Sequence, residues 1–443
     1  MAADNVSASA GLRIHIDRPP PMLPGFLCMH SRHDADVPFQ PGDEFPFEDR
    51  AVEIIVAGDF VDVMPRAGKL QFLLECRRVL MPRGLLRVTD LSHTDELARV
   101  AAMAGLATAA HTPIAETARA AISELRDVGS AAALEFGKRD RQLAADAFVS
   151  ILIPAFNPRF FAECLDSALA QTYSNIEIVI CDDSSESAIE ELVRAQAHRR
   201  PIRYARNEAR LGPRGNFTRC FERARGEFVK YLCDDDLLAP TCVASLLDAF
   251  RLVPDMTLAT SRRQRINANG QRIDDQPATV PVVRRDSVIT GWSLANSMIM
   301  VGLNTIGEPS TTLFRKADLL DRAPGYFGFD GDPGHGIIDM ATWATLLLQG
   351  DAVYLHECLS SFRIHAGQRQ HDSSKLQRNI ESIRTLQAAW LALGMHEKLA
   401  PDRLLAKPFP VPFDCDWMEA SVAGVAARRI ERNFGAAGMG GPS

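Results

Sequence analysis

At 443 residues the chain is too long for one hydrophobic core, so its length predicts two domains with extensions. Its 46% hydrophobic and 24% charged residues are typical of a soluble globular protein. A net charge of -7 gives no electrostatic case for nucleic acid or an anionic membrane as the main partner.

The termini and the cysteines indicate the compartment. Nothing near the N-terminus resembles a signal peptide, and no apolar run approaches the roughly 20 residues that span a bilayer. The nine cysteines include no CxxC pair, which argues against structural zinc and for reduced thiols. We therefore expect a cytoplasmic protein without an integral membrane segment, with peripheral attachment to the inner membrane as an alternative.

Residues 12–90 alternate short strands and helices. Leu12–Ile16, Val52–Ala57 and Leu85–Val88 have the pattern of strands, and Leu70–Leu80 has helical spacing. This alternation indicates a doubly wound sheet.

Two stretches of this region, Phe45–Asp49 and Phe72–Gly84, resemble class I methyltransferases. In that family a glycine-rich turn after the first strand approaches S-adenosylmethionine, and an acid after the second strand holds the ribose. Here Asp17-Arg18-Pro19 occupies the turn and His30 stands in the place of the acid. The resemblance therefore implies a small, partial Rossmann-like domain over residues 1–91 that has lost its cofactor devices.

Residues 92–147 are rich in Ala, Leu, Glu and Arg and nearly free of aromatic residues. The spacing of Leu97, Val100, Met103 and Leu106 predicts a helix. We expect this stretch to be a helical connector, with an exposed linker as the alternative.

From residue 148 the pattern becomes a strand, a helix, a strand and a helix, over Phe148–Pro154, Phe161–Leu169, Ile176–Ile180 and Ala188–Ala197. Ligands of such βαβ sheets bind outside the carboxyl ends of the strands. Carboxylates stand at these ends: Asp182 and Asp183 follow one strand, and Asp234, Asp235 and Asp236 follow the apolar run 228–233.

Three adjacent carboxylates repel one another and resist burial. A divalent cation explains them, because oxygen ligands suit Mg²⁺ or Mn²⁺ and such ions usually arrive with a phosphate-bearing substrate. The alternative is a solvated turn in which Asp236 caps the following helix.

Five motifs resemble the family 2 glycosyltransferases of the GT-A fold, over about residues 148–368: Ser150–Asn157, Gln171-Thr172-Tyr173, Ile176–Ser185, Asn207 with Leu211-Gly212, and Tyr231–Asp236. The resemblance implies an inverting transfer from a nucleotide-diphosphate sugar to an acceptor hydroxyl on a cell-surface glycan, a lipid or a protein glycan. It also implies Mn²⁺ or Mg²⁺ on the pyrophosphate, where the metal neutralises the leaving group.

The resemblance also assigns residues to the donor and the metal. The metal ligands are Asp235 or Asp236 together with His365, and Arg363 suits the diphosphate. Cys233 replaces the usual first acid of the Asp-x-Asp-Asp pattern. Alternatives are a turn role for Gly212, a helix N-cap for Asn216 and a structural His365. The donor residues implied are Pro154, Ala155, Asn157, Asp182, Asp183, Gly212, Asn216 and Asp234.

An inverting transfer needs a general base for the acceptor hydroxyl. Asp339, ahead of Trp343, matches the family's base, with Ile338 where a Glu is usual; a helix cap is the alternative. Glu308 is expected on the acceptor side, or else in a surface turn. The glycine-rich loop 325–336 is expected to be a mobile lid.

Residues 369–443 are expected to form a helical extension, with helices over Ser373–Leu393 and near Trp417–Phe434. These helices would cover the acceptor groove or form a homodimer.

The predicted protein is therefore α/β. It joins the methyltransferase-like domain, the connector, a GT-A glycosyltransferase domain at 148–368 with a doubly wound mixed sheet, and the helical tail. Its predicted activity is that of a glycosyltransferase of polysaccharide biosynthesis. The rivals are a nucleotidyltransferase, whose usual Gly-rich loop with Lys is missing at 155–160, a nucleotide-binding scaffold without activity, and a bifunctional methyltransferase-glycosyltransferase.

Overall fold

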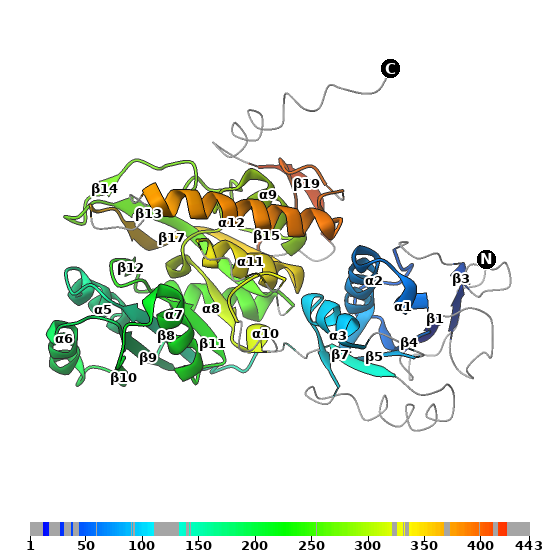
Figure 1. Ribbon diagram of the computed structural model, residues 1–443, viewed down its shortest axis with the longest axis horizontal. Coiled ribbons are helices and arrows are strands. Elements are labelled where there is room, and N and C mark those ends of the chain that lie inside the picture. The colour runs from blue at the N-terminus through cyan, green and yellow to red at the C-terminus, as the bar shows by residue number, and fades with distance from the viewer. Residues whose placement is uncertain are drawn as a thin grey trace, which may run out of the picture. The chain divides into compact units, whose positions relative to one another are not determined.

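The computed structural model describes residues 12–16, 27–30, 37–38, 44–58, 60–89, 91, 94–109, 133–138, 141, 143–253, 255–320, 326–330, 332, 336–366, 373–397, 399–410 and 415–422. The chain folds as two compact units, Met1–Arg141 and Gln142–Ser443 (Figure 1). None of the described helices has the length and apolar character needed to span a bilayer.

The first unit is one seven-stranded sheet in the order β3-β2-β1-β4-β5-β7-β6. Neighbours from β3 to β5 are parallel, whereas β7 is antiparallel to both β5 and β6. The strand order reverses between β1 and β4, as in a doubly wound sheet. The elements are β1 (Leu12–Ile16), β2 (Leu27–His30), β3 (Val37–Pro38), β4 (Val52–Ala57), α1 (Phe60–Val63), α2 (Arg66–Val79), β5 (Leu80–Val88), α3 (Thr94–Met103), β6 (Leu106–Thr108) and β7 (Leu134–Lys138).

The two stretches that resemble methyltransferases are held together in this unit. Arg78 of α2 donates hydrogen bonds to the carbonyl oxygens of Phe45 and Phe47, both at 2.8 Å. Phe45 also packs edge-on against Phe72, with the ring centroids 6.0 Å apart. The residues of these two stretches therefore attach the loop before β4 to helix α2. The turn Asp17–Pro19 lies outside the described residues.

The prediction of a helical connector at 92–147 is wrong for most of its described length. Among its described residues α3 is the one helix, while β6 and β7 complete the first sheet, and the unit extends to Arg141 instead of ending at residue 91. The pairing of β7 with β5 also gives two buried cations their partners. Arg87 of β5 pairs with Glu135 of β7 at 2.7 Å, and Lys138 Nζ donates a hydrogen bond to the Leu80 carbonyl.

The second unit is built on a twelve-stranded mixed sheet. Its main path is β10-β9-β8-β11-β16-β13-β17-β15-β18-β19, with β12 on β17 and β14 on β13. The first half has the predicted βαβ alternation: β8 (Val149–Ala155), α5 (Phe161–Leu169), β9 (Ile176–Asp182), α6 (Ala188–Gln196), β10 (Ile202–Arg206), α7 (Gly212–Arg223) and β11 (Phe228–Tyr231). Strands β8–β11 run parallel, since β8 pairs in parallel with β9 and β11, and β9 with β10.

The second half of this unit adds more helices and strands of both directions, with β13 and β17 parallel to each other and β16, β15 and β18 antiparallel to their neighbours. The elements of this half are β12 (Leu237–Leu238), α8 (Cys242–Leu252), β13 (Leu258–Ile266), β14 (Arg272–Ile273), β15 (Ser287–Ile289), α9 (Gly291–Val301), the 3₁₀ turn η1 (Pro309–Thr311), β16 (Leu313–Arg315), α10 (Ala317–Leu320), α11 (Ile338–Leu348), β17 (Ala352–Arg363), α12 (Ser373–Ala392), η3 (Met395–Glu397), β18 (Arg403–Pro408) and β19 (Met418–Ser421). The core of the unit is apolar: β8 and β9 are buried along their whole length, as expected for parallel strands covered on both faces.

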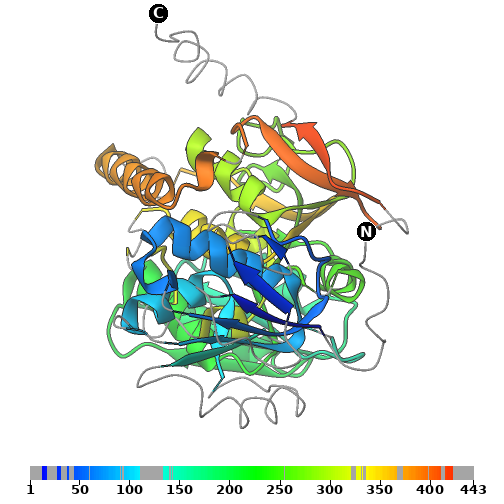
Figure 2. The ribbon, with the colours of Figure 1, turned by 90° about the vertical axis from the view of Figure 1, so that its right-hand side faces the viewer.

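The C-terminal extension is only partly helical. α12 confirms the predicted helix at 373–393, but Met418–Ser421 is the strand β19, paired with β18 (Figure 2). β18 in turn pairs with β15, so the extension lengthens the sheet of the second unit. The remainder of the predicted helix at 417–434, from residue 423 onward, lies outside the described residues.

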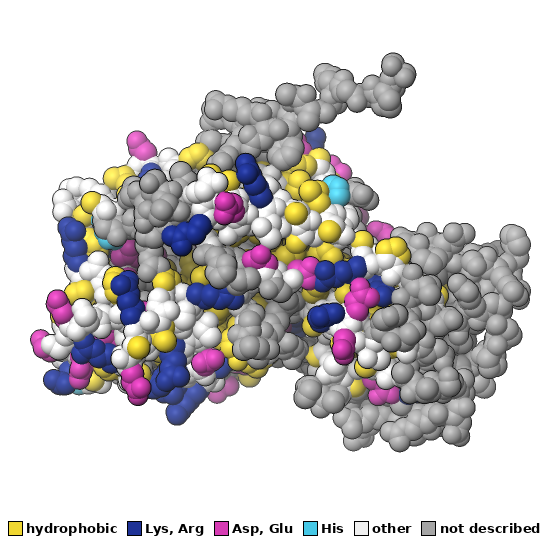
Figure 3. Space-filling model, in the orientation of Figure 1, with side chains coloured by type: hydrophobic (Ala, Val, Ile, Leu, Met, Phe, Trp, Pro, Cys, Tyr) yellow, Lys and Arg dark blue, Asp and Glu magenta, His cyan; other side chains and the backbone are white. Residues whose placement is uncertain are grey.

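Acidic and basic side chains are interspersed on the face seen in Figure 3.

Candidate active site

The carboxyl ends of three adjacent parallel strands form the rim of the site. β8 ends at Ala155, β9 at Asp182 and β11 at Tyr231, with β8 between the other two. The loops that follow these strands therefore meet at one edge of the sheet, as the sequence predicts.

A cavity of about 290 Å³ opens at this rim. Most of the predicted donor and metal residues line it, and the remaining lining residues are Phe156, Pro213, Phe217 and Cys233. The predicted residues brought together here are Pro154, Asn157, Asp183, Gly212, Asn216, Asp234, Asp235 and His365.

The two acids after β9 face different ways. Asp183 lines the cavity and anchors the next loop: its Oδ1 accepts from the Leu211 N–H and its Oδ2 from the Gly212 N–H, both at 2.8 Å. Asp182 is fully buried and does not line the cavity. Its carboxylate instead accepts hydrogen bonds from the Ser184 N–H and the Tyr204 hydroxyl. The structure therefore separates a pair that the sequence treats alike.

Gly212 and Asn216 hold the start of α7 against the strand ends. Gly212 has φ +72°, a conformation that favours glycine, and no other atom lies within 4 Å of where its Cβ would be. Asn216 is not an N-cap: it lies inside α7, and its Nδ2 donates to the carbonyls of Ala155 and Cys181. Ala155 itself is buried and contributes only its backbone.

Asp234 fixes the loop after β8. Its Oδ2 accepts hydrogen bonds from the backbone N–H groups of Phe156 at 2.6 Å and Asn157 at 2.7 Å. Burial raises the pKa of Asp234 to about 6, although the hydrogen bond from Asn157 acts in the opposite direction. The Asp234 side chain therefore joins the acidic triplet to the loop that follows β8.

Asp235 and Asp236 also diverge. Asp235 lines the cavity, and its Oδ2 lies 3.1 Å from His365 Nε2. Asp236 is only 1% exposed, and its two oxygens accept from the Ser310 hydroxyl at 2.6 Å and the Arg363 N–H at 3.0 Å. Burial and the neighbouring Asp235 hold the pKa of Asp236 well above its usual range. Of the two candidates for the metal, only Asp235 faces the cavity, and Asp236 does not cap a helix.

Arg363 differs from the prediction that it faces a diphosphate. It is fully buried, pairs with Glu163 Oε2 at 2.7 Å and donates through Nε to the Asp235 carbonyl. Its guanidinium also lies over the Phe160 ring, 4.5 Å from the centroid. The His365 ring packs on the same Phe160, with centroids 4.8 Å apart, so Phe160 and Arg363 hold the Asp235–His365 pair in place.

The Asp235–His365 pair suits a divalent cation that keeps other ligands. One carboxylate and one imidazole would fill only some of the coordination positions of an octahedral ion. The other positions would be left for ligands such as substrate phosphate, as in Mg²⁺ and Mn²⁺ sites that share substrate phosphates. No group of three or more metal-binding His, Cys, Asp or Glu side chains occurs among the residues that the structure describes. The donor set thus fits a metal shared with a phosphate and does not form a closed protein cage.

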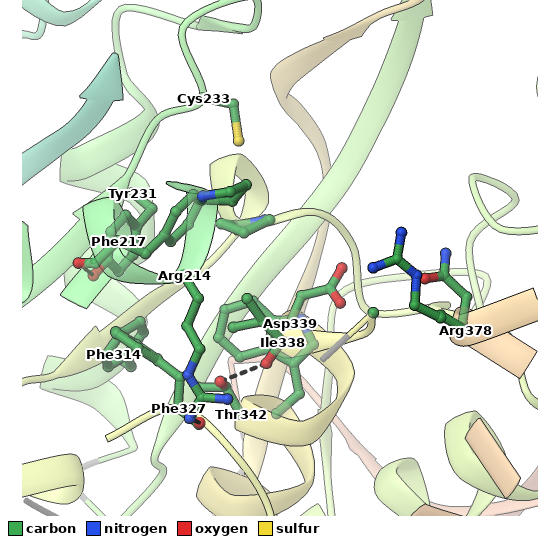
Figure 4. A pocket seen from close by; sticks show the side chains of 15 residues that line it. Arg214, Phe217, Tyr231, Cys233, Phe314, Phe327, Ile338, Asp339, Thr342 and Arg378 are labelled. Atoms are coloured by element: carbon green, nitrogen blue, oxygen red, sulfur yellow. Dashed lines mark hydrogen bonds between the residues drawn. The ribbon is translucent and has the colours of Figure 1, made fainter. Parts of the chain in front are cut away.

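A second cavity of about 480 Å³ adjoins the first and shares Pro213, Phe217 and Cys233 with it. Figure 4 shows Asp339 at its centre. The other lining residues are Arg214, Tyr231, Pro309, Phe314, Phe327, Gly336, Ile338, Thr342, Trp343, Arg378 and Asn379.

Asp339 is held in one orientation. It lies in the first turn of α11, where Oδ1 accepts from the Met340 N–H at 2.8 Å and Oδ2 from Asn304 Nδ2 at 2.7 Å. It does not act as the N-cap, which is Ile337. Burial raises the pKa of Asp339, and the nearby charge of Glu308 adds to this effect.

Glu308 is neither in an open surface turn nor among the cavity-lining residues. Its Oε2 lies 2.6 Å from Nε of Arg263, whose side chain is 1% exposed. Glu308 therefore forms an ion pair with Arg263 of β13. The loop 325–336, expected to be a lid, is only partly described.

The sequence reasoning passed over several cavity residues. Phe156 is 44% exposed at the mouth of the smaller cavity, with the Arg210 guanidinium 4.4 Å from its ring centroid. Phe156 belongs to the motif Ser150–Asn157, and an aromatic residue directly after a strand of this sheet could have indicated a cavity-lining position. No local signal placed Arg378 beside Asp339, because the two lie on different helices.

Comparisons with known proteins identify the family. Glycosyl transferase family 2 matches residues 150–328. An uncharacterised Mycobacterium tuberculosis protein is 30% identical over 241 residues, which cover 53% of this chain and 73% of that protein. An uncharacterised glycosyltransferase of Nostoc sp. is 27% identical over 235 residues, which cover 51% of this chain and 67% of the relative.

The protein is a glycosyltransferase of the nucleotide-sugar type with a mixed α/β sheet. More specifically, the chain belongs to glycosyl transferase family 2. Among solved structures, S. aureus TarS residues 1–349 in complex with UDP-GlcNAc is similar with a TM-score of 0.41 and 16% identity, and the match covers 56% of this chain and 72% of that one.

Proposed function

We propose that the protein catalyses an inverting, metal-assisted transfer of a sugar from a nucleotide-diphosphate donor to an acceptor hydroxyl. The observation that carries this proposal is the connection of the two cavities. Asp235 with His365 lines one and Asp339 lines the other, and three residues are common to both. A donor with its diphosphate at Asp235 would present its sugar toward Asp339.

The smaller cavity is the proposed donor site. Asp183 holds the loop at Gly212, whose missing side chain leaves space for a nucleotide, and Asp234 holds the opposite loop. Asp235 and His365 would bind Mn²⁺ or Mg²⁺. Such an ion, when bound, neutralises the charge that develops on the departing diphosphate.

Asp339 is the proposed general base. Its carboxylate would take the proton of the acceptor hydroxyl while that oxygen attacks the anomeric carbon from the side opposite the diphosphate, which inverts the configuration. The hydrogen bonds from Met340 and Asn304 fix the direction of the carboxylate. Its raised pKa makes it a stronger proton acceptor than an ordinary Asp.

Binding and turnover measurements test the proposal. Calorimetric titration of UDP and GDP with Mn²⁺ establishes nucleotide binding, and a panel of UDP- and GDP-sugars establishes the donor by hydrolysis or transfer. Asp339→Asn should bind nucleotide like the native protein and lose turnover. Asp248→Asn, on the exposed face of α8, is the matched control.

Two results would overturn the proposal. Failure of every nucleotide to bind with either metal would remove the donor site, and unchanged turnover in Asp339→Asn would exclude this residue as the base.

The first unit supports a second candidate, a bifunctional methyltransferase-glycosyltransferase. Its strand order reverses between β1 and β4, and ligands of doubly wound sheets bind where the order reverses. Titration of the full chain with S-adenosylmethionine tests this candidate. Absence of binding would leave the glycosyltransferase as the single activity.

A further inference from the structure

Aromatic side chains line part of the larger cavity, and Phe217 is the partly exposed one among five whose other members are at most 3% exposed. Phe217 and Tyr231 stack with centroids 4.7 Å apart, and Phe314 meets Trp343 edge-on at 6.1 Å. The electron-rich faces of such rings attract the weakly positive C–H groups of an apolar ligand surface. The Trp343 indole N–H is bonded to the Gly307 carbonyl, which fixes the plane of that wall.

The charges on these walls are unequal. Arg214 of α7 and Arg378 of α12 both line the cavity, whereas Asp339 is the single carboxylate among the described lining residues. In Figure 4 Asp339 lies between the two arginines. A guanidinium presents paired N–H donors in a planar fork that matches the two oxygens of a carboxylate.

The two arginines differ in setting. Arg214 is half-buried and donates through Nη2 to the Phe327 carbonyl at 2.6 Å, and burial lowers its pKa, although the nearby charge of Asp332 acts in the opposite direction. A bound anion would offset that cost of burying the cation. Arg378 is exposed on the C-terminal helix α12 and lines the cavity. Helix α12 thus contributes to the wall of the cavity, as it would if the C-terminal helices covered an acceptor groove.

We propose that the larger cavity binds a sugar unit that carries a carboxylate or a comparable anionic group, with Arg378 as the residue that selects the anion. This inference rests on the proposed function and names its substrate class. The anion can belong to the transferred sugar of the donor or to the sugar of the acceptor. In both cases the partly exposed ring of Phe217 packs on the sugar and Arg378 takes the charge.

Two pairs of probes distinguish the sources, each differing only by a carboxylate. UDP-glucuronate against UDP-glucose, with Mn²⁺, tests the donor. Methyl β-D-glucuronide against methyl β-D-glucoside, with UDP and Mn²⁺ present, tests the acceptor. We expect the anionic member of one pair to bind about tenfold more tightly, the size of one charge-assisted contact.

Variants on α12 connect that preference to the side chain. Arg378→Gln should reduce the preference to less than about twofold, and Arg378→Lys, which keeps the charge but not the fork, should retain part of it. Arg384→Gln is the matched control, because Arg384 is also exposed on α12 but does not line the cavity.

The inference is overturned if neither pair shows a preference for the anion, or if the preference survives in Arg378→Gln. UDP binding with Mn²⁺ serves as a separate readout. If the native protein binds UDP but shows no anion preference, this inference alone is defeated, whereas absence of UDP binding defeats the proposed function itself.

Discussion

Ser310 joins the two halves of the proposed site, so its hydroxyl offers a sharp test of the structure. It is 2% exposed in the turn η1, donates to Asp236 Oδ2 at 2.6 Å and accepts from the Cys233 N–H at 3.0 Å. The neighbouring Lys230 Nζ donates to the Ser310 carbonyl. Ser310→Ala removes the hydroxyl and leaves both of its buried partners without it.

The expected cost follows from the burial of both partners of the Ser310 hydroxyl. Each buried donor or acceptor left without its partner costs about 1–3 kcal/mol, and the Asp236 oxygen and the Cys233 N–H both lose theirs. We therefore expect Ser310→Ala to lower the free energy of unfolding by about 2–4 kcal/mol. The Asp236 carboxylate would retain only the Arg363 N–H among these contacts.

Tryptophan fluorescence during urea unfolding measures this cost for the second unit, which contains Ser310. All four tryptophans, at 292, 343, 390 and 417, lie in the second unit, so the signal does not report on the first. Ser187→Ala is the matched control, because its hydroxyl also donates to a carboxylate, Glu191 at 2.7 Å, but in an exposed position. Its effect should stay within about 0.5 kcal/mol.

A double-mutant cycle with Asp236→Asn isolates the contact itself, with an expected coupling of about 1.5 kcal/mol or more. The reasoning is refuted if Ser310→Ala costs no more than Ser187→Ala, or if the cycle shows no coupling.

Three further predictions concern the chemistry. Asp235→Asn should weaken Mn²⁺-dependent UDP binding by at least about tenfold in calorimetry, because one ligand loses its charge; unchanged binding would remove Asp235 from the metal site. The base must be ionised and burial raises the pKa of Asp339, so kcat should fall as the pH is lowered through that raised pKa. Asn304→Ala, which removes a donor to the ionised carboxylate, should move this fall to higher pH, and a profile identical to the native one would contradict the assignment. Gly212→Ala should cost about 1–2 kcal/mol in the fluorescence assay, since φ is +72° and no neighbouring atom is met; a neutral effect would show that this backbone conformation relaxes freely.

Local sequence patterns determined much of the second unit. Alternating apolar runs predicted β8, α5, β9 and α6, because burial on both faces requires continuous apolar strands and one-sided burial requires helical spacing. The acidic residues at strand ends predicted the rim, because parallel strands bring their carboxyl ends to one edge. Eight predicted residues do line one cavity there.

Pairings between distant segments were not encoded locally. β7 is separated from its partner β5 by a helix, a strand and undescribed chain, so residues 92–147 looked like a connector when only their own periodicity was considered. β18 joins β15 across more than a hundred residues, and the tail was predicted to be helical for the same reason.

The sequence by itself determined the parallel strands of the second unit and the acids at their carboxyl ends, because strand periodicity and acid placement are local properties. Only the tertiary structure decided which acids face the cavity. Asp235 and Asp236 are neighbours with equal chemistry, yet contacts with His365 and with Ser310 and Arg363 direct one toward the cavity and the other into the core. Side-chain direction depends on partners distant in the chain, and that information appears only when the chain is folded.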